Sequence, residues 1–367
     1  MNLLVDGRIY LSKTKGGVAR IFNNILPIIC DLDSEILITL FFTNQPQIEY
    51  PEHRQIRSLN LKRVNYLRPN RLFAKVNRQL QLIELMKYVQ NTEDHIWIST
   101  YYTSPSFFWK GKKVQIVYDL IYEKFPDQLQ NSSKVIRNKS KAINDADLIF
   151  CISNSTANDL LNYYHVGDNK VQVSYLSHNE IFEVRSERKI ECHMPFKFIL
   201  YVGNRGSYKN FKTLLTAYHL WSKNNEIKLV VVGPSFTDSE MKEVRAFGLE
   251  TNVINLHSMD DNQLCDLYNQ AQAFVYPSLY EGFGIPLLEA MACGCLIIAS
   301  KIPSTLEVAK DIPIYFVAED VNSLLHAFDR LSSTNGHQQR IRRGIELSNQ
   351  YSWKLTATKI LDGLKSV

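Results

Sequence analysis

Two glutamates beside a pair of glycines could bind a ligand through hydrogen bonds. Glu281 and Glu289 lie in the stretch EGFGIPLLEAMACG, with seven residues between them. Gly282 and Gly284 let the backbone approach a ligand and leave N–H groups free where a helix begins. A carboxylate accepts hydrogen bonds from paired hydroxyls, so the two glutamates suit a molecule with sugar hydroxyls at two places. Taken alone, each glutamate is also explained by solvation or by the helix dipole.

The elements around this loop predict how it is held. Ala273–Tyr276 and Cys295–Ala299 are short apolar runs, typical of strands buried on both faces. Between them, Pro286 stands where a helix would begin and Gly294 where it would end. Two strands joined by a helix form a βαβ unit, which predicts a parallel sheet.

A second loop carries two cations. The apolar run Phe198–Val202 predicts a strand that leads into Gly203, followed by Arg205 and Lys209 and then by a helix from Phe211. A strand, a glycine loop with cations and a helix start make an anion site. Arg205 could bind a diphosphate through two parallel hydrogen bonds and Lys209 as a point charge. The alternative is a basic surface loop.

The stretch from Glu281 to Gly294 resembles the signature of the group 1 (family 4) retaining glycosyltransferases. The resemblance implies an α/β fold of the GT-B type, with two Rossmann-like domains whose parallel sheets face a cleft, and a nucleotide-sugar donor. It assigns the donor-sugar hydroxyls to Glu281 and the ribose diol to Glu289. It also assigns the donor diphosphate to Arg205 and Lys209, although Tyr208 stands where the family often has arginine.

The resemblance extends to the first half of the chain. A predicted strand, Val114–Tyr118, is followed by Asp119, where the family often has a His-Asp pair. Tyr118 departs from that pattern: it could hydrogen-bond a sugar hydroxyl but would carry a proton less readily at neutral pH. The resemblance implies catalytic roles for Glu281, Arg205, Lys209 and Asp119. It implies donor contacts for Gly17, Tyr118, Gly203, Gly282, Phe283, Gly284, Ile285 and Glu289.

The chain is long enough for two domains with cores of their own. We expect a first Rossmann-like domain at 1–178 on the acceptor side and a second at 195–345 on the donor side. The polar stretch between them predicts a boundary. The resemblance implies that 346–367 forms a final helix that crosses back to the first domain.

Composition indicates a soluble protein. Of the 367 residues, 45% are apolar and 22% are charged, and no apolar run approaches the length of a membrane span. The start, MNLLVDGRIY, has too short an apolar stretch for a signal peptide. Six scattered cysteines indicate buried thiols in a reducing compartment, so we expect a cytoplasmic protein.

One segment is strongly basic. Between Arg54 and Lys87 the chain has nine cations and one acid, a net charge of +8, whereas the remainder carries −3. Within it, Arg71, Lys75 and Arg78 follow helical spacing. An apolar stripe on another face of the same helix comprises Leu72, Val76, Leu80, Ile83 and Met86.

Two interpretations of this basic segment stand side by side. One is a solvated helix face; the other is a ridge that contacts an anionic membrane at its inner surface, or a phosphate-bearing acceptor. Nucleic acid is not expected as a partner, because the segment has few aromatic residues for base stacking.

Two Asp-x-Asp triplets, at 31–33 and 145–147, could suggest a metal site. Each follows a predicted helix and precedes a strand, so we interpret both as polar connections. We predict no catalytic metal, and no cofactor beyond the nucleotide sugar that serves as donor substrate.

The function that follows is that of a retaining hexosyltransferase, with mannose among the candidate sugars. It would act on a hydroxyl of a glycan or lipid-linked saccharide in surface polysaccharide biosynthesis. Two alternatives remain on the same fold: a nucleotide-sugar epimerase or hydrolase, and a nucleotide-sugar binding protein without catalysis.

Overall fold

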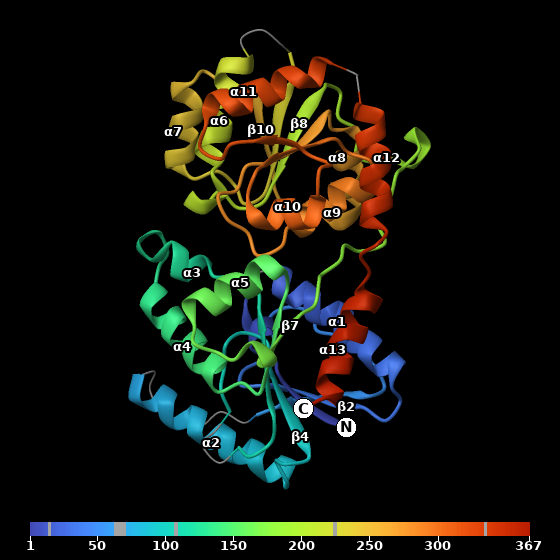
Figure 1. Cartoon of the computed structure of the whole chain (residues 1–367). Helices are drawn as coiled ribbons and strands as arrows, with labels where there is room; N and C mark the ends of the chain where they lie inside the picture. Colours follow the sequence, from blue (N-terminus) through green and yellow to red (C-terminus); the bar gives the residue numbers. More distant parts are fainter. Residues whose placement is uncertain (14–15, 62–70, 106–108, 223–225, 334–335) are drawn as a thin grey trace. The chain divides into compact units, whose positions relative to one another are not determined.

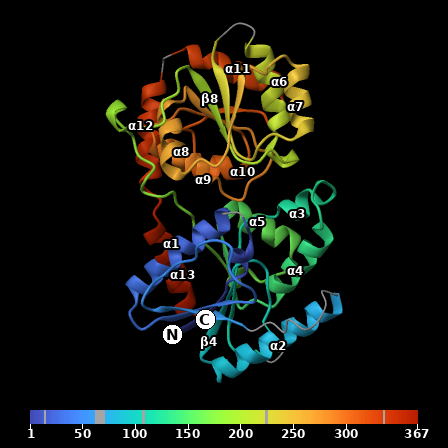
Figure 2. The same cartoon turned by 180° about the vertical axis from the view of Figure 1, so that it is seen from behind.

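We describe the chain from a computed structural model, shown in Figure 1. It describes residues 1–13, 16–61, 71–105, 109–222, 226–333 and 336–367; for 71–75 and 78–79 it describes the backbone only. The chain divides into two compact units. Unit 1 comprises residues 1–176 and 353–367, and unit 2 comprises residues 177–352. The expected α/β fold with two Rossmann-like domains is confirmed, because each unit is a parallel sheet with helices packed around it (Figures 1 and 2).

Unit 1 contains a seven-stranded sheet in the order β3-β2-β1-β4-β5-β6-β7, with every described pair of neighbours parallel. The strands are β1 Asn2–Asp6, β2 Leu37–Phe42, β3 Ile56–Asn60, β4 His95–Ser99, β5 Lys113–Val117, β6 Leu148–Cys151 and β7 Val171–Val173. The helices are α1 Gly17–Leu32, α2 Arg71–Val89, α3 Ile121–Lys124, α4 Ser132–Asn144, α5 Asn154–Tyr163 and α13 Trp353–Lys365.

Unit 2 contains a six-stranded parallel sheet in the order β10-β9-β8-β11-β12-β13. The strands are β8 Phe198–Val202, β9 Lys228–Val232, β10 Val253–Leu256, β11 Ala273–Tyr276, β12 Ile297–Ser300 and β13 Ile314–Phe316. The helices are α6 Phe211–Ser222, α7 Asp238–Ala246, α8 Asp261–Gln270, α9 Ile285–Ala292, α10 Pro303–Ala309, α11 Val321–Asp329 and α12 His337–Ser348.

Each sheet has one place where the strand order reverses. In unit 1 the reversal lies between β1 and β4, and in unit 2 between β8 and β11. Helices on the two sides of such a point lie on opposite faces of the sheet, which leaves a crevice at the carboxyl ends of the strands. These two crevices are where ligands are expected.

The final helix completes unit 1. Helix α13 lies beside α1 in both views (Figures 1 and 2). The Thr356 hydroxyl donates to the Tyr175 carbonyl at 2.6 Å, and the Ser174 hydroxyl donates to the Thr356 carbonyl at 3.2 Å. Gly363 lies so close to the Phe150 ring that an added Cβ would be 2.5 Å from Cζ of that ring. The sequence therefore needs glycine at this helical position for packing.

The polar stretch after residue 176 packs on unit 2. Arg185 Nη1 donates to Asp266 Oδ1 at 2.8 Å, and Asp266 Oδ2 accepts the backbone N–H groups of Glu191 and Cys192 at 3.0 Å each. The charges that suggested a connection between domains instead bind this segment to α8. Sequence boundaries near 178 and 195 therefore differ from the structural division at 176, which holds this segment within unit 2.

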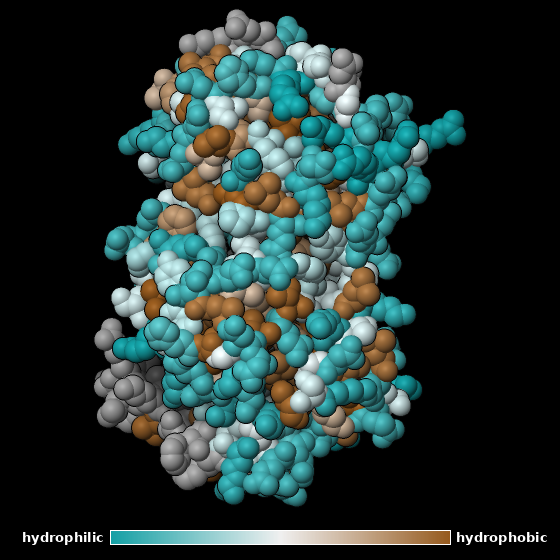
Figure 3. Space-filling view, viewed as in Figure 1, coloured by the Kyte–Doolittle hydropathy of each residue, from teal (hydrophilic) through white to brown (hydrophobic). Residues whose placement is uncertain are grey.

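Helix α2 has an unusual distribution of side chains. It buries two amides, Asn77 and Gln81, at 8% and 5% exposure. Three apolar side chains of the predicted stripe are exposed: Val76 at 42%, Leu80 at 43% and Ile83 at 51%. Figure 3 shows a small hydrophobic area at the lower left, where Figure 1 draws α2. The side chains of Arg71, Lys75 and Arg78 lie outside the described residues.

We predict that Gly363→Ala destabilises unit 1. An alanine in a helix normally stabilises by about 1 kcal/mol relative to glycine, but overpacking against Phe150 costs about 1–3 kcal/mol. Urea unfolding followed by tryptophan fluorescence measures the difference. Gly17→Ala at the start of α1 is the control, because its Cβ would meet no atom within 4 Å. Equal midpoints for Gly363→Ala and the native chain would contradict this packing.

Candidate functional site

Two loops meet at the strand-order reversal of unit 2. After β8, Gly203 has a φ of +138°, and the chain makes one turn of 3-10 helix at Ser207–Lys209. After β11, the next loop lies against the first. Leu279 N–H donates to the Tyr208 carbonyl at 2.8 Å, and Asn210 Nδ2 donates to the Pro277 carbonyl at 3.0 Å. These bonds hold the loop with Lys209 beside the loop with Glu281.

Lys209 and Glu281 form an ion pair. Lys209 Nζ donates to Glu281 Oε1 at 2.7 Å, and the Ser278 hydroxyl donates to the same oxygen at 2.6 Å. Glu281 is 8% exposed. Burial, and then the neighbouring Glu281 carboxylate, raise the pKa of Tyr276 well above its ordinary value. The carboxylate is thus fixed in position by side chains from both loops.

Glu289 lies within α9, and the helix begins directly after Gly284. Gly284 has a φ of +112°, and a Cβ there would be 2.9 Å from the Leu287 side chain, so glycine is required. Glu289 is 3% exposed, and the Tyr268 hydroxyl donates to its Oε2 at 3.3 Å.

Arg205 is paired within unit 2. Its Nε donates to Glu240 Oε1 at 2.7 Å and its Nη2 to Glu240 Oε2 at 3.2 Å, while its guanidinium lies 4.4 Å from the centre of the Phe236 ring. Burial alone would raise the pKa of Glu240, but hydrogen bonds from Arg205 and Thr237 outweigh it and lower that pKa. Arg205 Nη1 is buried without a partner among the described residues. Two of the three guanidinium nitrogens are therefore occupied, and its diphosphate role stays a prediction.

The other predicted donor contacts of unit 2 differ in environment. Gly282 and Phe283 are buried. The Phe283 ring packs edge-on against Tyr351 at 6.0 Å, which is a core contact. Ile285 is half-buried as the first residue of α9. Their contacts with a donor also stay predictions.

Three predicted residues belong to unit 1. Gly17 is exposed at the start of α1, with open space beside it. Tyr118 is buried, and its hydroxyl donates to the Thr100 carbonyl at 3.0 Å. Asp119 Oδ1 accepts the N–H of Ile121 at 3.1 Å, at the start of α3. The structure thus gives Tyr118 and Asp119 local structural contacts, and their roles toward a donor remain predictions.

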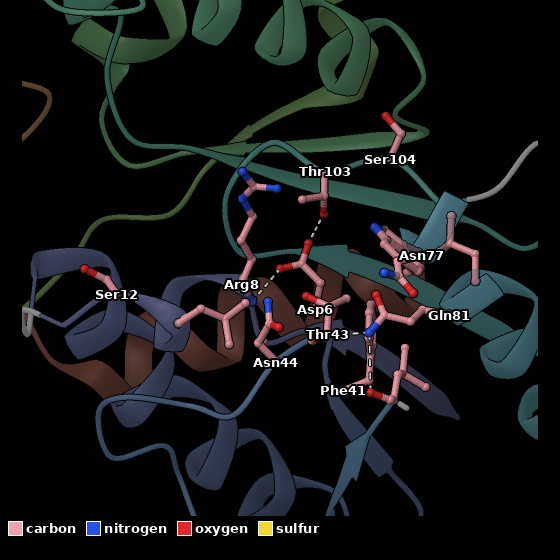
Figure 4. A pocket seen from close by; sticks show the side chains of 15 residues that line it. Asp6, Arg8, Ser12, Phe41, Thr43, Asn44, Asn77, Gln81, Thr103 and Ser104 are labelled. Carbon is pink, nitrogen blue, oxygen red and sulfur yellow. Dashed lines mark hydrogen bonds between the residues drawn. The ribbon is translucent and has the colours of Figure 1, made fainter. Parts of the chain in front are cut away.

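The structure adds a residue that sequence reasoning missed. Asp6, at the end of β1, is 3% exposed and bridges the strand-order reversal of unit 1 (Figure 4). Its Oδ1 accepts hydrogen bonds from the Thr100 hydroxyl at 2.6 Å and from the Arg8 N–H at 3.2 Å. Its Oδ2 accepts a hydrogen bond from the Thr103 hydroxyl. Burial raises the pKa of Asp6, although hydrogen bonds from Thr100 and Arg8 oppose the shift. The signal in the sequence is an acid directly after an apolar strand run, LLVD.

Neither a metal cluster nor a membrane span is found in the described part of the chain. No group of three or more His, Cys, Asp or Glu side chains there could hold a metal ion. Helices long and apolar enough to cross a membrane are also absent from those residues. Asp33 and Asp145, from the two Asp-x-Asp triplets, stand at the ends of α1 and α4. Independence from metal stays a prediction.

The family model described as glycosyl transferases group 1 matches residues 185–346, which lie within unit 2. The O-antigen chain mannosyltransferase B of Escherichia coli is 25% identical over 317 residues, covering 80% of this chain and 83% of that protein. The serotype-specific mannosyltransferase WbdA of Escherichia coli is 28% identical over 247 residues. That match covers 64% of this chain but only 30% of the longer relative.

A solved structure shows the same fold over the whole chain. The Anabaena protein HepE, in complex with UDP-glucose, aligns with a TM-score of 0.78 and 14% identity. The alignment covers 100% of both chains.

We predict that Asp6 makes stability depend on pH in an unusual direction. A carboxyl whose pKa is raised by folding stabilises the fold below its ordinary pKa of 3.8, and this contribution is lost as the pH rises through the folded value. The stability of Asp6→Asn relative to the native chain should therefore increase from pH 4 upward. Urea unfolding from pH 4 to pH 8 measures it.

Asp311→Asn is the control with the opposite sign. A hydrogen bond from Arg343 lowers the pKa of Asp311 below its ordinary value of 3.8. The stability of the native chain relative to this variant should therefore rise slightly just above pH 4 and then stay level, with no decline toward pH 8. The same pH trend in both variants would contradict the assigned environment of Asp6.

Proposed function

Since the chain is a group 1 glycosyltransferase of the GT-B fold, we propose that it moves a hexose from a nucleotide sugar to a hydroxyl of a glycan or lipid-linked saccharide. The observation that carries this proposal is the Lys209–Glu281 pair at the strand-order reversal of unit 2, next to the start of α9. It combines a cation, two buried carboxylates and the N-terminus of a helix, which are the partners that a diphosphate and two sugar diols need.

Each residue of the site has its own proposed role. Lys209 and the N–H groups at Gly284 and Ile285 stabilise the departing diphosphate. Glu281 accepts hydrogen bonds from hydroxyls of the donor sugar, and Glu289 accepts hydrogen bonds from the ribose diol. Arg205 holds the loop through Glu240 and is the second cation proposed for the diphosphate.

The reaction is proposed to retain the anomeric configuration by attack from the front face. The bond between the anomeric carbon and the phosphate oxygen breaks, and the acceptor oxygen bonds to the same face of that carbon. The acceptor proton passes to the departing phosphate oxygen, so the step needs no separate base and no metal. Lys209 compensates the negative charge that develops on the leaving group.

Mannose is the sugar to test first, and surface polysaccharide the product class. Both relatives are mannosyltransferases, one of an O-antigen chain and one serotype-specific. HepE was solved with UDP-glucose, which makes uridine a base to include in the panel.

We further propose that α2 contacts the inner face of an anionic membrane, where lipid-linked acceptors would be met. Support comes from the +8 charge of residues 54–87 and from the exposed apolar side chains Val76, Leu80 and Ile83 on this helix. Cations attract anionic lipid while apolar side chains enter the interface, which is the pattern of an interfacial helix.

We predict different effects for the two glutamates. Glu281→Gln should lower turnover and leave the affinity for free nucleoside diphosphate nearly unchanged, because this carboxylate serves the sugar. Glu289→Ala should weaken nucleoside diphosphate binding itself. The loss is about 1.5–3 kcal/mol of transition-state stabilisation for Glu281→Gln and of binding free energy for Glu289→Ala, if the hydrogen bonds are charge-assisted. Calorimetric titration with UDP and GDP, together with transfer assays on nucleotide sugars, measures both effects.

Glu243→Gln on the exposed face of α7 is the control and should leave turnover and affinity unchanged. Equal loss of nucleotide affinity in Glu281→Gln and Glu289→Ala would refute the division of roles. Release of free sugar or an epimer at the full rate without any acceptor would favour a hydrolase or epimerase instead.

We predict that binding to anionic vesicles needs both features of α2. The triple change Arg71→Gln, Lys75→Gln, Arg78→Gln should weaken partitioning by roughly a hundredfold at low salt, since each cation contributes on the order of 1 kcal/mol. The triple change Val76→Ser, Leu80→Ser, Ile83→Ser should weaken it at high salt as well, because the apolar contribution is not screened. Co-sedimentation with anionic and neutral vesicles measures partitioning.

A matched control changes three exposed apolar residues elsewhere, Val184, Val317 and Leu355, to serine. Equal sedimentation of the control and both α2 variants would contradict membrane contact and support the interpretation of α2 as a solvated helix face.

A further inference from the structure

A lysine is buried in unit 1. Helix α4 buries three side chains at helical spacing, Lys139, Ala142 and Ile143, so a lysine stands where an apolar residue is expected. The Lys139 side chain is 1% exposed. Lysine is almost never fully buried unless it is paired, because removing an ammonium group from water is costly. The partners of Lys139 are therefore the place to look for its role.

Lys139 connects α4 to the end of β5 and to α3. Its Nζ donates to Glu123 Oε2 at 2.9 Å and to the Asp119 carbonyl at 2.9 Å. Asp119 Oδ1 lies 3.9 Å from the same nitrogen. Helices α3 and α4 lie side by side in both views (Figures 1 and 2). One ammonium group thus holds the backbone of Asp119 and lies beside its carboxylate.

The ion pair of Lys139 and Glu123 is covered, whereas Asp119 reaches the surface. The side chain of Glu123 is 3% exposed, and that of Asp119 is 30% exposed. The Tyr164 hydroxyl donates to Glu123 Oε1 at 2.5 Å, so both oxygens of this buried carboxylate accept a hydrogen bond. Of Asp119 and Glu123, Asp119 is therefore the one that a substrate can reach.

The loop after β4 packs on the same ammonium group. Tyr102 has a φ of +50°, a backbone conformation that residues other than glycine rarely adopt. The centre of its ring lies 5.0 Å from Lys139 Nζ, which is a cation–π contact. The same ring packs edge-on against Tyr118 at 6.2 Å. Such a conformation persists only where the surrounding contacts impose it, and it is concentrated at functional sites. Lys139 thus contacts the chain after two neighbouring strands, β4 and β5.

Stability alone does not account for this cluster. The attraction within a buried ion pair rarely offsets the loss of hydration, and apolar side chains of similar size are often as stable or more stable. Lys139 and Glu123 could therefore be replaced by apolar residues if they served only the core. Their presence is explained if the reaction needs Asp119 to be held in one position.

We propose that Lys139 is a positioning residue, which holds Asp119 at the end of β5 in the orientation that the transfer reaction needs. The proposal rests on the proposed function, and it adds a residue of unit 1 that acts without contacting a substrate. Lys139 acts through Asp119. Without the ammonium group, the Asp119 carbonyl loses its donor, and the Asp119 carboxylate leaves the position in which it serves the reaction.

Two variants separate positioning from stability. Lys139→Met leaves the Glu123 carboxylate buried without this counter-ion, so the melting temperature should fall. The triple change Lys139→Met, Glu123→Leu, Tyr164→Phe removes the three polar side chains together, and the melting temperature should return close to the native value. The turnover number should not return with it. We expect kcat to stay about ten- to a hundredfold below the native value, because a small displacement of a positioned group causes such a loss.

Release of GDP from GDP-mannose and of UDP from UDP-glucose, with methyl α-mannoside as acceptor, measures kcat. The affinity for free UDP and GDP should be unchanged in the triple variant, because the residues proposed to bind them belong to unit 2. Asp119→Ala should lower kcat by a similar factor. Adding Asp119→Ala to the triple variant should cause little further loss, because both changes act through one carboxylate.

The double change Lys124→Met, Asp159→Leu is the matched control. Lys124 Nζ lies 2.9 Å from Asp159 Oδ1, and this ion pair joins the same helix α3 to α5. The control should keep the native kcat, whereas a general requirement for α3 to stay in place would lower kcat in the control as well.

Amide hydrogen exchange reports the position of Asp119 without any substrate, because the Ile121 N–H donates to Asp119 Oδ1 at 3.1 Å. Exchange at Ile121 should be faster in the triple variant and native in the control. The proposal is overturned if the triple variant has the native kcat, if the control loses as much, if the triple variant is as unstable as Lys139→Met, or if exchange at Ile121 stays native. If the native chain turns over neither nucleotide sugar, the proposed function fails, and exchange at Ile121 decides whether Lys139 positions Asp119.

Discussion

A parallel sheet whose strand order reverses leaves its strand ends uncovered at one place, and both units of this protein place charged side chains there. In unit 1, Asp6 at the end of β1 bonds to Thr100 after β4. In unit 2, Lys209 after β8 bonds to Glu281 after β11. In each case a polar contact connects the two central strands, so the position of the reactive or binding groups follows from the sheet topology.

The two crevices differ in charge. In unit 2 the carboxylate of Glu281 has Lys209 as its counter-ion at 2.7 Å, so an anion and a polyol can bind side by side. In unit 1 the buried carboxylate of Asp6 is held by hydroxyl and backbone donors. The same sheet topology thus gives an ion pair at one strand-order reversal and a hydrogen-bonded lone carboxylate at the other.

Continuous apolar runs made much of the fold predictable. The strands β8 and β11 begin and end where the sequence indicates, because both are short apolar runs. Strand β3, with the sequence IRSLN, was missed because three of its five residues are exposed at the edge of the sheet. Helix α2 shows the limit of periodicity. Three side chains of its predicted apolar stripe are exposed, and the face that packs on the core buries Leu85 and Val89 together with two amides.

The site was predictable only where the local sequence contains all of the partners. Glu281, Ser278 and Gly284 lie within one loop, and their arrangement follows from it. Arg205 was assigned to a diphosphate, yet its partner Glu240 lies 35 residues away. Asp6 was missed because its partner Thr100 lies 94 residues away, and an acid at the end of a strand is common. Contacts over such distances depend on the order of the strands, which the sequence does not display.

The division of unit 1 between both ends of the chain has a consequence during synthesis on the ribosome. Unit 2 is contiguous and can fold as soon as its own residues have been translated. Unit 1 lacks α13 until the last residues of the chain have been translated. Before that point the Phe150 ring cannot pack on Gly363, and the Tyr175 carbonyl cannot accept the hydrogen bond from Thr356. Unit 1 is therefore the unit that reaches its final structure last, although most of its residues precede unit 2 in the chain.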